Sequence, residues 1–249
     1  MSALALKLIA EFAMFGDHFC AAMFDTLALP WNRDIYWVIR SAARIAFPIF
    51  GFQLSEGLRY TSNKWKYLLR LCIFAVVSEP FFNRALFGSW QDRYHQSVYV
   101  TLILGFFVML LIQKGGEKKG AARILIWVSV PLVSFVLAFL AEMVFFTDYG
   151  GAGVFMLTIF GINTLPFPEI RKDPRKEFFL RTGIFLLAAL VLFLCTNSSE
   201  AYALFGVIPV AFYSGIHGKM SKKMRIFFYA FYPLHLAVLS VCVAVLSAV

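Results

Sequence analysis

Two residues able to do chemistry, Asp17 and His18, lie next to each other inside the apolar stretch AMFGDHFCAAMF, residues 13–24. An imidazole can act as a general base near neutral pH, and a nearby carboxylate can orient it. An ionisable side chain at the centre of a membrane costs about 3 kcal/mol or more and is usually functional. These two residues are therefore the first candidates for a site.

Helical spacing separates the two residues. Lys7, Glu11, Met14 and His18 share one helix face, whereas Asp17 lies about 100° around the helix from His18. We expect the polar face to point into a helix bundle. We assign the chemistry to His18 and a supporting role between helices to Asp17, and we expect a carboxylate from another helix to orient His18.

Two further segments carry charge beside a proline. Arg40 and Arg44 are four residues apart and share a face, and Pro48 cannot donate to the Arg44 carbonyl, so the helix should kink there. Arg44 is expected near the membrane midplane, and Arg40 is either an interfacial anchor or a ligand-binding residue. Glu79, which precedes Pro80, is the expected partner of Arg44 or His18.

Polar residues also flank the apolar segments on the side that His18 approaches. His95 and Gln96 lie in one loop, and Asp148 precedes a glycine-rich turn, Gly150–Gly153. The helix that follows this turn presents N–H groups able to hold a carbonyl or an anion, but we favour the alternative, in which the glycines form a tight hairpin. In the last apolar segment, Tyr232 and His235 share a face. We expect His235 nearer the cytoplasmic half of the membrane and His18 in the outer half.

The composition excludes a soluble globular domain. Hydrophobic residues make up 61% of the 249 residues, charged residues make up 15%, and the mean hydropathy is +0.76. The sequence predicts an all-α polytopic membrane protein with a single domain, residues 1–249, and no cleavable signal peptide, because charges interrupt the first apolar run. Nine spans are expected, of which the sixth is short enough to be re-entrant: 3–24, 34–58, 65–88, 95–113, 122–146, 151–166, 177–196, 200–216 and 226–248.

Basic residues gather in alternate loops. One set of loops holds only Arg33, Arg84 and Arg93; the other holds Arg59, Lys64, Lys66 and Arg70, then Lys114, Lys118, Lys119 and Arg123, then Arg171, Lys172, Arg175, Lys176 and Arg181, and finally Lys219, Lys222, Lys223 and Arg225. The positive-inside rule places the rich set in the cytoplasm, so the N-terminus is expected inside and the C-terminus outside. We attribute the net charge of +9 to these cytoplasmic loops, which would contact anionic membrane lipids. We exclude nucleic acid as a partner. The cysteines and histidines lack ligand spacing, so no metal is expected.

An ordered set of short matches covers nearly the whole chain and resembles the TraX family, which is named for pilin acetylation and is similar to transmembrane acyltransferases of the acyltransferase-3 type. The matches are Asp17-His18, Arg44–Phe50, Ser55–Gly57, Tyr67–Arg70, Ser78–Pro80, Asp148–Gly150 and Phe231–Leu236. A family Gln-Asn pair before the fourth span is replaced here by His95-Gln96.

The resemblance implies acyl transfer in a bacterial cytoplasmic (inner) membrane, with acetyl-CoA or another acyl-CoA as co-substrate. His18 would be the base or the acyl carrier, and Asp17 and Glu79 would orient it or the acceptor. Arg44, Asp148, His95 and Gln96 would bind substrate, while Arg40, Tyr232, His235 and Glu11 would bind the acyl-CoA. The acceptor would be an extracytoplasmic amine or hydroxyl, on a pilin N-terminus, a peptide, a glycan or a cell-wall polymer.

Two other classes of function remain open. The same buried charges would serve a proton-coupled transporter or flippase, although the sequence has no inverted repeat. A non-catalytic membrane assembly factor would tolerate replacement of Asp17, His18 and Arg44. Binding of acyl-CoA would separate the acyltransferase from both.

Overall fold

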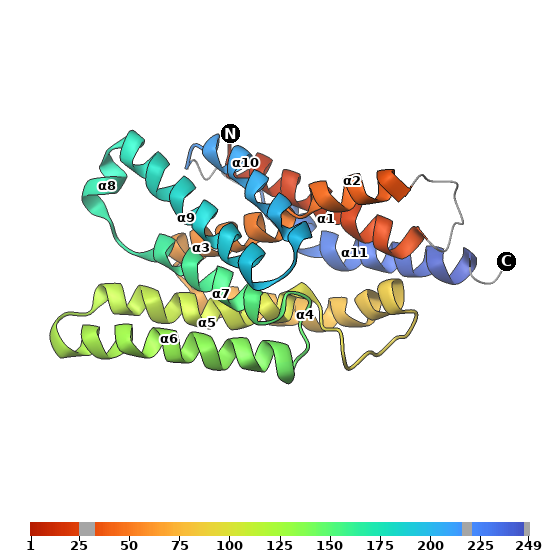
Figure 1. Cartoon of the computed structure of the whole chain (residues 1–249), viewed down its shortest axis with the longest axis horizontal. Coiled ribbons are helices and arrows are strands. Elements are labelled where there is room, and N and C mark those ends of the chain that lie inside the picture. The colour runs from red at the N-terminus through yellow and green to blue at the C-terminus, as the bar shows by residue number, and fades with distance from the viewer. Residues whose placement is uncertain (25–32, 216–220, 247–249) are drawn as a thin grey trace.

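The computed structural model describes residues 1–24, 33–215 and 221–246, with the backbone only at Lys222, Lys223 and Arg225, and it contains no strand within these residues (Figure 1). Lys219, from the last of the expected basic loops, lies outside the described residues. The helices are α1 (Ala3–Met23), α2 (Arg33–Ala43), α3 (Ala46–Tyr60), α4 (Lys64–Phe87), α5 (Val98–Glu117), α6 (Gly120–Met143), α7 (Gly150–Gly161), η1 (Ile162–Thr164), α8 (Pro168–Lys172), α9 (Pro174–Cys195), η2 (Ser198–Gly206), α10 (Val207–Ala211) and α11 (Lys222–Leu246).

The predicted helical membrane class is confirmed. Five helices in the described part of the chain are long and apolar enough to cross a bilayer: Arg33–Tyr60, Val98–Glu117, Gly120–Met143, Pro174–Cys195 and Ile226–Leu246. A shorter apolar helix covers Gly150–Thr164. Each of the nine expected segments coincides with a helix or a broken helix, while the count of nine crossings and their orientation stay predictions.

The break between α2 and α3 has the expected cause. The helix is interrupted between Ala43 and Ala46, two residues before Pro48. Because proline has no N–H, the carbonyl of Arg44 loses its partner in the following turn. On the other side of the break, the N–H of Arg44 donates to the carbonyl of Ser41 at 3.2 Å. This bond spans three residues and tightens the last turn of α2. The break leaves Arg44 at a bend, with its side chain directed into the bundle.

The helices pack around an aromatic core. Phe47, Phe52, Phe106, Phe160 and Phe185 are almost completely buried. The pair α5 and α6 runs side by side, and α7 packs on both of them and on α9 (Figure 1). The helix α11 packs mainly along α4, and α1 contacts α2, α3 and α11. This arrangement brings α1, α2 and α11, which are far apart in the sequence, to one region.

Candidate functional site

A pair of hydrogen-bonded imidazoles lies between α1 and α11. Nδ1 of His18 is 2.8 Å from Nε2 of His235, and the two rings are nearly parallel, with an interplanar angle of 6°. Both side chains are buried, and Phe82 and Tyr232 present ring edges to His18. Nδ1 of His235 lies 2.8 Å from the carbonyl oxygen of Phe231, one turn earlier in α11.

The hydrogen bond between His235 and the Phe231 carbonyl determines which imidazole donates in the bond between His18 and His235. A carbonyl oxygen only accepts, so Nδ1 of His235 carries a proton and donates it to Phe231. In the neutral ring Nε2 of His235 is then the acceptor, and Nδ1 of His18 is the donor. Nε2 of His18 keeps its lone pair. The arrangement therefore prepares His18 as a base or nucleophile and His235 as the group that orients it.

Two expectations about this pair are wrong. The partner of His18 is an imidazole, not a carboxylate, and His235 lies at the depth of His18, not in the opposite half of the membrane. The depth was misjudged because α11 begins at Lys222, about one helical turn earlier than expected.

A cluster of charged residues adjoins the imidazole pair on the other face of α1. The Asp17 carboxylate bridges Arg40, at 3.0 Å, and Arg44, at 2.9 Å. Arg44 also pairs with Glu200 of η2 at 2.9 Å. These contacts are of the kind expected for a supporting role of Asp17 between helices, and they give Arg40 a carboxylate partner. Three separate segments thus meet at Arg44.

Glu79 does not join this cluster. Both oxygens of its carboxylate accept from the Ser97 N–H, at 3.3 and 3.2 Å, and the expected pairing with Arg44 or His18 is absent among the described residues. Ser97 precedes the first residue of α5, where unpaired N–H groups attract a carboxylate. Glu79 therefore caps a helix from its place in α4.

Of the four expected substrate-binding residues, Gln96 and Asp148 come together where the loop before α5 meets the loop before α7. The Asp148 N–H donates to the Gln96 carbonyl at 2.9 Å. His95 is exposed, lies 3.3 Å from Asp92 and stacks on Phe87. A hydrogen bond from the Tyr94 N–H holds the pKa of Asp92 below its usual range. A backbone hydrogen bond thus joins Gln96 to Asp148, whereas His95 contacts Asp92 in its own loop and Phe87 at the end of α4.

The glycines Gly150–Gly153 form the first turn of α7, and the short connection that precedes them folds α7 back on α6 as a tight hairpin, as the second interpretation expected. Gly150 has φ of 48°, which favours glycine. The Gly151 N–H donates to the Glu142 carboxylate at 3.0 Å, so a side chain of the protein already occupies the start of α7.

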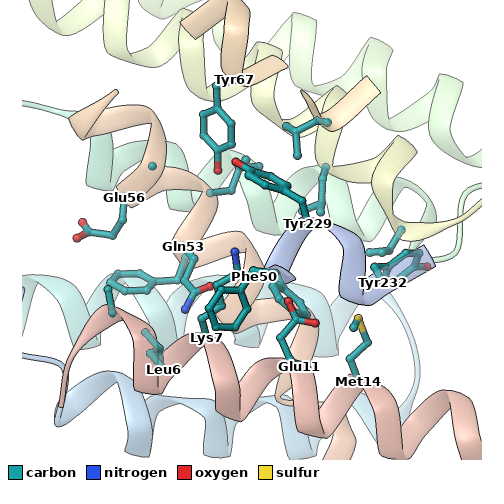
Figure 2. Close-up of a pocket in the computed structure, with 18 of the residues that line it drawn as sticks. Leu6, Lys7, Glu11, Met14, Phe50, Gln53, Glu56, Tyr67, Tyr229 and Tyr232 are labelled. Carbon is teal, nitrogen blue, oxygen red and sulfur yellow. The ribbon is translucent and has the colours of Figure 1, made fainter. Parts of the chain in front are cut away.

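A cavity of about 240 Å³ lies among α1, α3, α4, α5 and α11 (Figure 2). Glu56 lies at one end, and Met14 and Tyr232 lie at the other. Lys7 and Glu11, from the polar face predicted for the first helix, line the middle. Met14 is one turn before His18 on that face, so the cavity ends about one turn from the imidazole pair.

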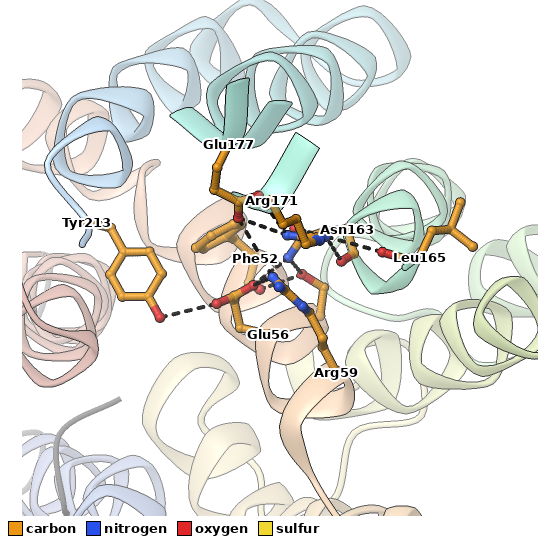
Figure 3. A network of polar contacts seen from close by, with 9 residues as sticks. Phe52, Glu56, Arg59, Asn163, Leu165, Arg171, Glu177 and Tyr213 are labelled. Atoms are coloured by element: carbon orange, nitrogen blue, oxygen red, sulfur yellow. Dashed lines mark hydrogen bonds and ion pairs between the residues drawn. The ribbon is translucent and has the colours of Figure 1, made fainter. Parts of the chain in front are cut away.

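A polar network surrounds Glu56 at the opposite end of the cavity (Figure 3). Glu56 accepts from Asn163 at 2.8 Å, from Tyr213 at 3.1 Å and from Arg59 at 3.4 Å. Arg171 donates to the Asn163 carbonyl at 2.7 Å and also pairs with Glu177. The contact between Glu56 and Arg59, three residues apart in α3, is therefore one part of a network that ties α3 to η1, α8 and α9.

Sequence reasoning missed Glu200 and Gln53. Glu200 is 3% exposed and provides the second carboxylate for Arg44. Its signal was a lone carboxylate at the start of an apolar segment, which was available but was overlooked. Gln53 lines the cavity, and nothing in its spacing distinguished it from a polar residue that faces solvent.

Comparison with known proteins agrees with the ordered matches to the TraX family. Residues 2–243 match the model of the TraX protein family. The chain is 27% identical to the "Probable fimbrial assembly protein FimC, serogroup H1" of Dichelobacter nodosus over 255 residues, which cover 96% of this chain and 94% of that relative. No solved structure matches the chain. Since the family model covers nearly all of the sequence, the protein belongs to the TraX family.

Proposed function

We propose that the protein is a transmembrane acyltransferase that moves an acyl group, with acetyl favoured, from cytoplasmic acyl-CoA to an amine or hydroxyl on the outer face of the membrane. The observation that carries the proposal is the oriented pair of His18 and His235, about one turn from a cavity that leads away toward the opposite end of the bundle. Membership of a family named for pilin acetylation supports the same reaction.

The proposed topology has nine crossings of a bacterial inner membrane, with the N-terminus in the cytoplasm. The helical segments run back and forth along the long axis of the molecule (Figure 1), and the basic loops fall on alternate connections. In this orientation the network of Glu56, Arg59 and Arg171 lies at the cytoplasmic end of the cavity. Acyl-CoA would enter there, and its thioester would reach the cavity end formed by Met14 and Tyr232.

The proposed reaction uses Nε2 of His18 as a base. The acceptor nitrogen or oxygen attacks the thioester carbonyl while Nε2 takes its proton, and Nδ1 remains bonded to His235. Collapse of the tetrahedral intermediate breaks the C–S bond, and the proton on Nε2 passes to the leaving thiolate. The products are an amide or ester and free CoA. Transient acylation of Nε2 is the alternative route through the same lone pair.

Two groups near the imidazoles support the remaining roles. The hydroxyl of Tyr232 is buried and has no hydrogen-bond partner among the described residues, so it is available to the oxyanion of the intermediate. The carboxylates of Asp17, Glu200 and Asp148 gather in the neighbouring region, where they provide hydrogen-bond acceptors for the N–H groups of an amine acceptor.

The relative from Dichelobacter nodosus carries the name of a fimbrial assembly protein. A pilin N-terminus is therefore one candidate acceptor for this chain, beside peptides, glycans and cell-wall polymers.

The test uses the purified chain in lipid nanodiscs with radiolabelled acetyl-CoA and a panel of amine and hydroxyl acceptors. Wild-type protein should bind acetyl-CoA and transfer label, and His18→Ala should lose transfer while it retains binding and its helical content. His95→Ala is the matched control and should transfer normally, because His95 lies in an exposed loop. Failure of the wild-type protein to bind any acyl-CoA would refute the proposal. Substrate movement across liposomes that needs Glu79 but no acyl-CoA would favour a transporter.

A further inference from the structure

The middle of the cavity contains polar atoms without hydrogen-bond partners in the described part of the chain. Glu11 is 6% exposed, and its Oε2 has no hydrogen-bond partner among the described residues. The same holds for the buried Nε2 of Gln53. Both residues line the cavity, as does Lys7, whose Nζ lies 4.6 Å from the centre of the Phe228 ring (Figure 2). A buried polar atom without a partner is destabilising, so such a group in a cavity indicates a ligand that completes it.

The chemistry of these atoms restricts the ligand. Glu11 offers an acceptor for an N–H, whereas the side-chain amide of Gln53 offers an N–H for a carbonyl oxygen. A secondary amide presents one N–H and one carbonyl on adjacent atoms and satisfies both. The rings of Phe50, Phe228 and Tyr229 supply apolar surface for the methylene groups on either side of an amide. A fully apolar acyl chain would leave Glu11 and Gln53 unpaired.

We propose that Glu11 and Gln53, beside Lys7, form a subsite for a secondary amide in the arm that carries the acyl thioester. This inference rests on the proposed function and specifies which part of the donor the cavity recognises. The amide N–H donates to Oε2 of Glu11, and the amide oxygen accepts from Nε2 of Gln53. With the amide held there, the thioester end of the arm extends toward Met14 and Tyr232, the side of the cavity next to His18.

The test compares two soluble acyl donors, S-acetyl-N-acetylcysteamine, which contains one amide, and S-ethyl thioacetate, which contains none. For wild-type protein the amide-bearing donor should have the lower KM. Glu11→Leu and Gln53→Leu should each raise the KM of that donor by about 10-fold, the effect of one lost hydrogen bond, while the KM of S-ethyl thioacetate should stay unchanged.

Gln113→Leu is the matched control for Gln53→Leu. Gln113 is also buried in a helix and has an unpaired Oε1 among the described residues, but it does not line the cavity. Its replacement should change the KM of neither donor. Equal losses for both donors in the Glu11 and Gln53 variants, or no loss for either, would overturn the subsite and leave the acyltransferase proposal standing. Absence of transfer from acetyl-CoA by wild-type protein would instead refute the proposed function.

Discussion

The charged cluster around Arg44 allows a stability prediction that distinguishes its two carboxylates. Asp17 contacts both arginines, whereas Glu200 contacts Arg44 alone. The side chain of Asp17 is 19% exposed, and those of Arg44 and Glu200 are 14% and 4% exposed, so solvent screens these pairs weakly. Asp17→Asn therefore leaves Arg40 with no carboxylate partner among the described residues, while Arg44 keeps Glu200.

The expected loss in the free energy of unfolding depends on which arginine keeps a carboxylate partner in each variant. Removal of one partner from a buried ion pair costs about 3–5 kcal/mol, and we expect about 3 kcal/mol for Asp17→Asn because Arg40 keeps some contact with solvent. Glu200→Gln should cost only about 1 kcal/mol, because Arg44 keeps Asp17 and the glutamine oxygen still accepts a hydrogen bond. In the double variant Arg44 has neither carboxylate, so the loss should exceed the sum of the single losses by about 1 kcal/mol or more.

The assay is equilibrium unfolding in mixed micelles, with the folded fraction followed by tryptophan fluorescence. Glu169→Gln is the control, since its pair with Lys172 has a similar length, 3.1 Å, but is largely exposed. We expect a loss of about 0.5 kcal/mol or less there. Losses for Asp17→Asn and Glu200→Gln that add within about 0.5 kcal/mol would refute the inference that Arg44 depends on both carboxylates.

The remaining predictions concern packing and the imidazole pair. Gly105→Ala should destabilise the protein by about 1–3 kcal/mol in the same unfolding assay, because its new Cβ would lie 2.6 Å from Cβ of Leu157. Gly183→Ala in α9 should be neutral or stabilising, because its new Cβ would meet no described atom within 4 Å beyond the neighbouring backbone of α9 itself. Tyr232→Phe should lower kcat by about 10²-fold with little change in the KM of acetyl-CoA, since the lost hydroxyl would act on the oxyanion; an unchanged kcat would exclude that role. His235→Phe should lower kcat more than His235→Gln, because a glutamine amide oxygen can still accept from His18, and equal activities of the two variants would show that His235 does not orient His18.

The sequence correctly predicted those features that depend on residues close together in one helix. Helical spacing placed Glu11, Met14 and His18 on a buried face of α1, and the structure buries all three side chains. The missing N–H of Pro48 predicted the break after α2. Separation of Asp17 from His18 by about 100° predicted that they would serve different neighbours, as they do.

Contacts between helices were predicted less well, because they depend on how far one helix slides along another. A shift of one turn moves a side chain by about 5.4 Å, enough to exchange one hydrogen-bond partner for another. The helix α11 begins about one turn earlier than expected, and the expected depth of His235 was wrong by a comparable distance. Glu79 was misassigned for a different reason: the N–H at the start of α5 competes for a carboxylate, and spacing within α4 does not reveal that competitor.

One turn of α1 connects the two parts of the proposed site. Asp17 turns toward Arg40 and Arg44, and His18, the next residue, turns toward His235. The charged cluster therefore fixes the rotation of α1 about its axis, and that rotation sets whether Nδ1 of His18 can reach His235. Because a rotation by one residue would exchange these faces, Asp17 positions the base without touching it. The adjacency of Asp17 and His18 thus matters through the helix that carries both, while each partner comes from a different helix.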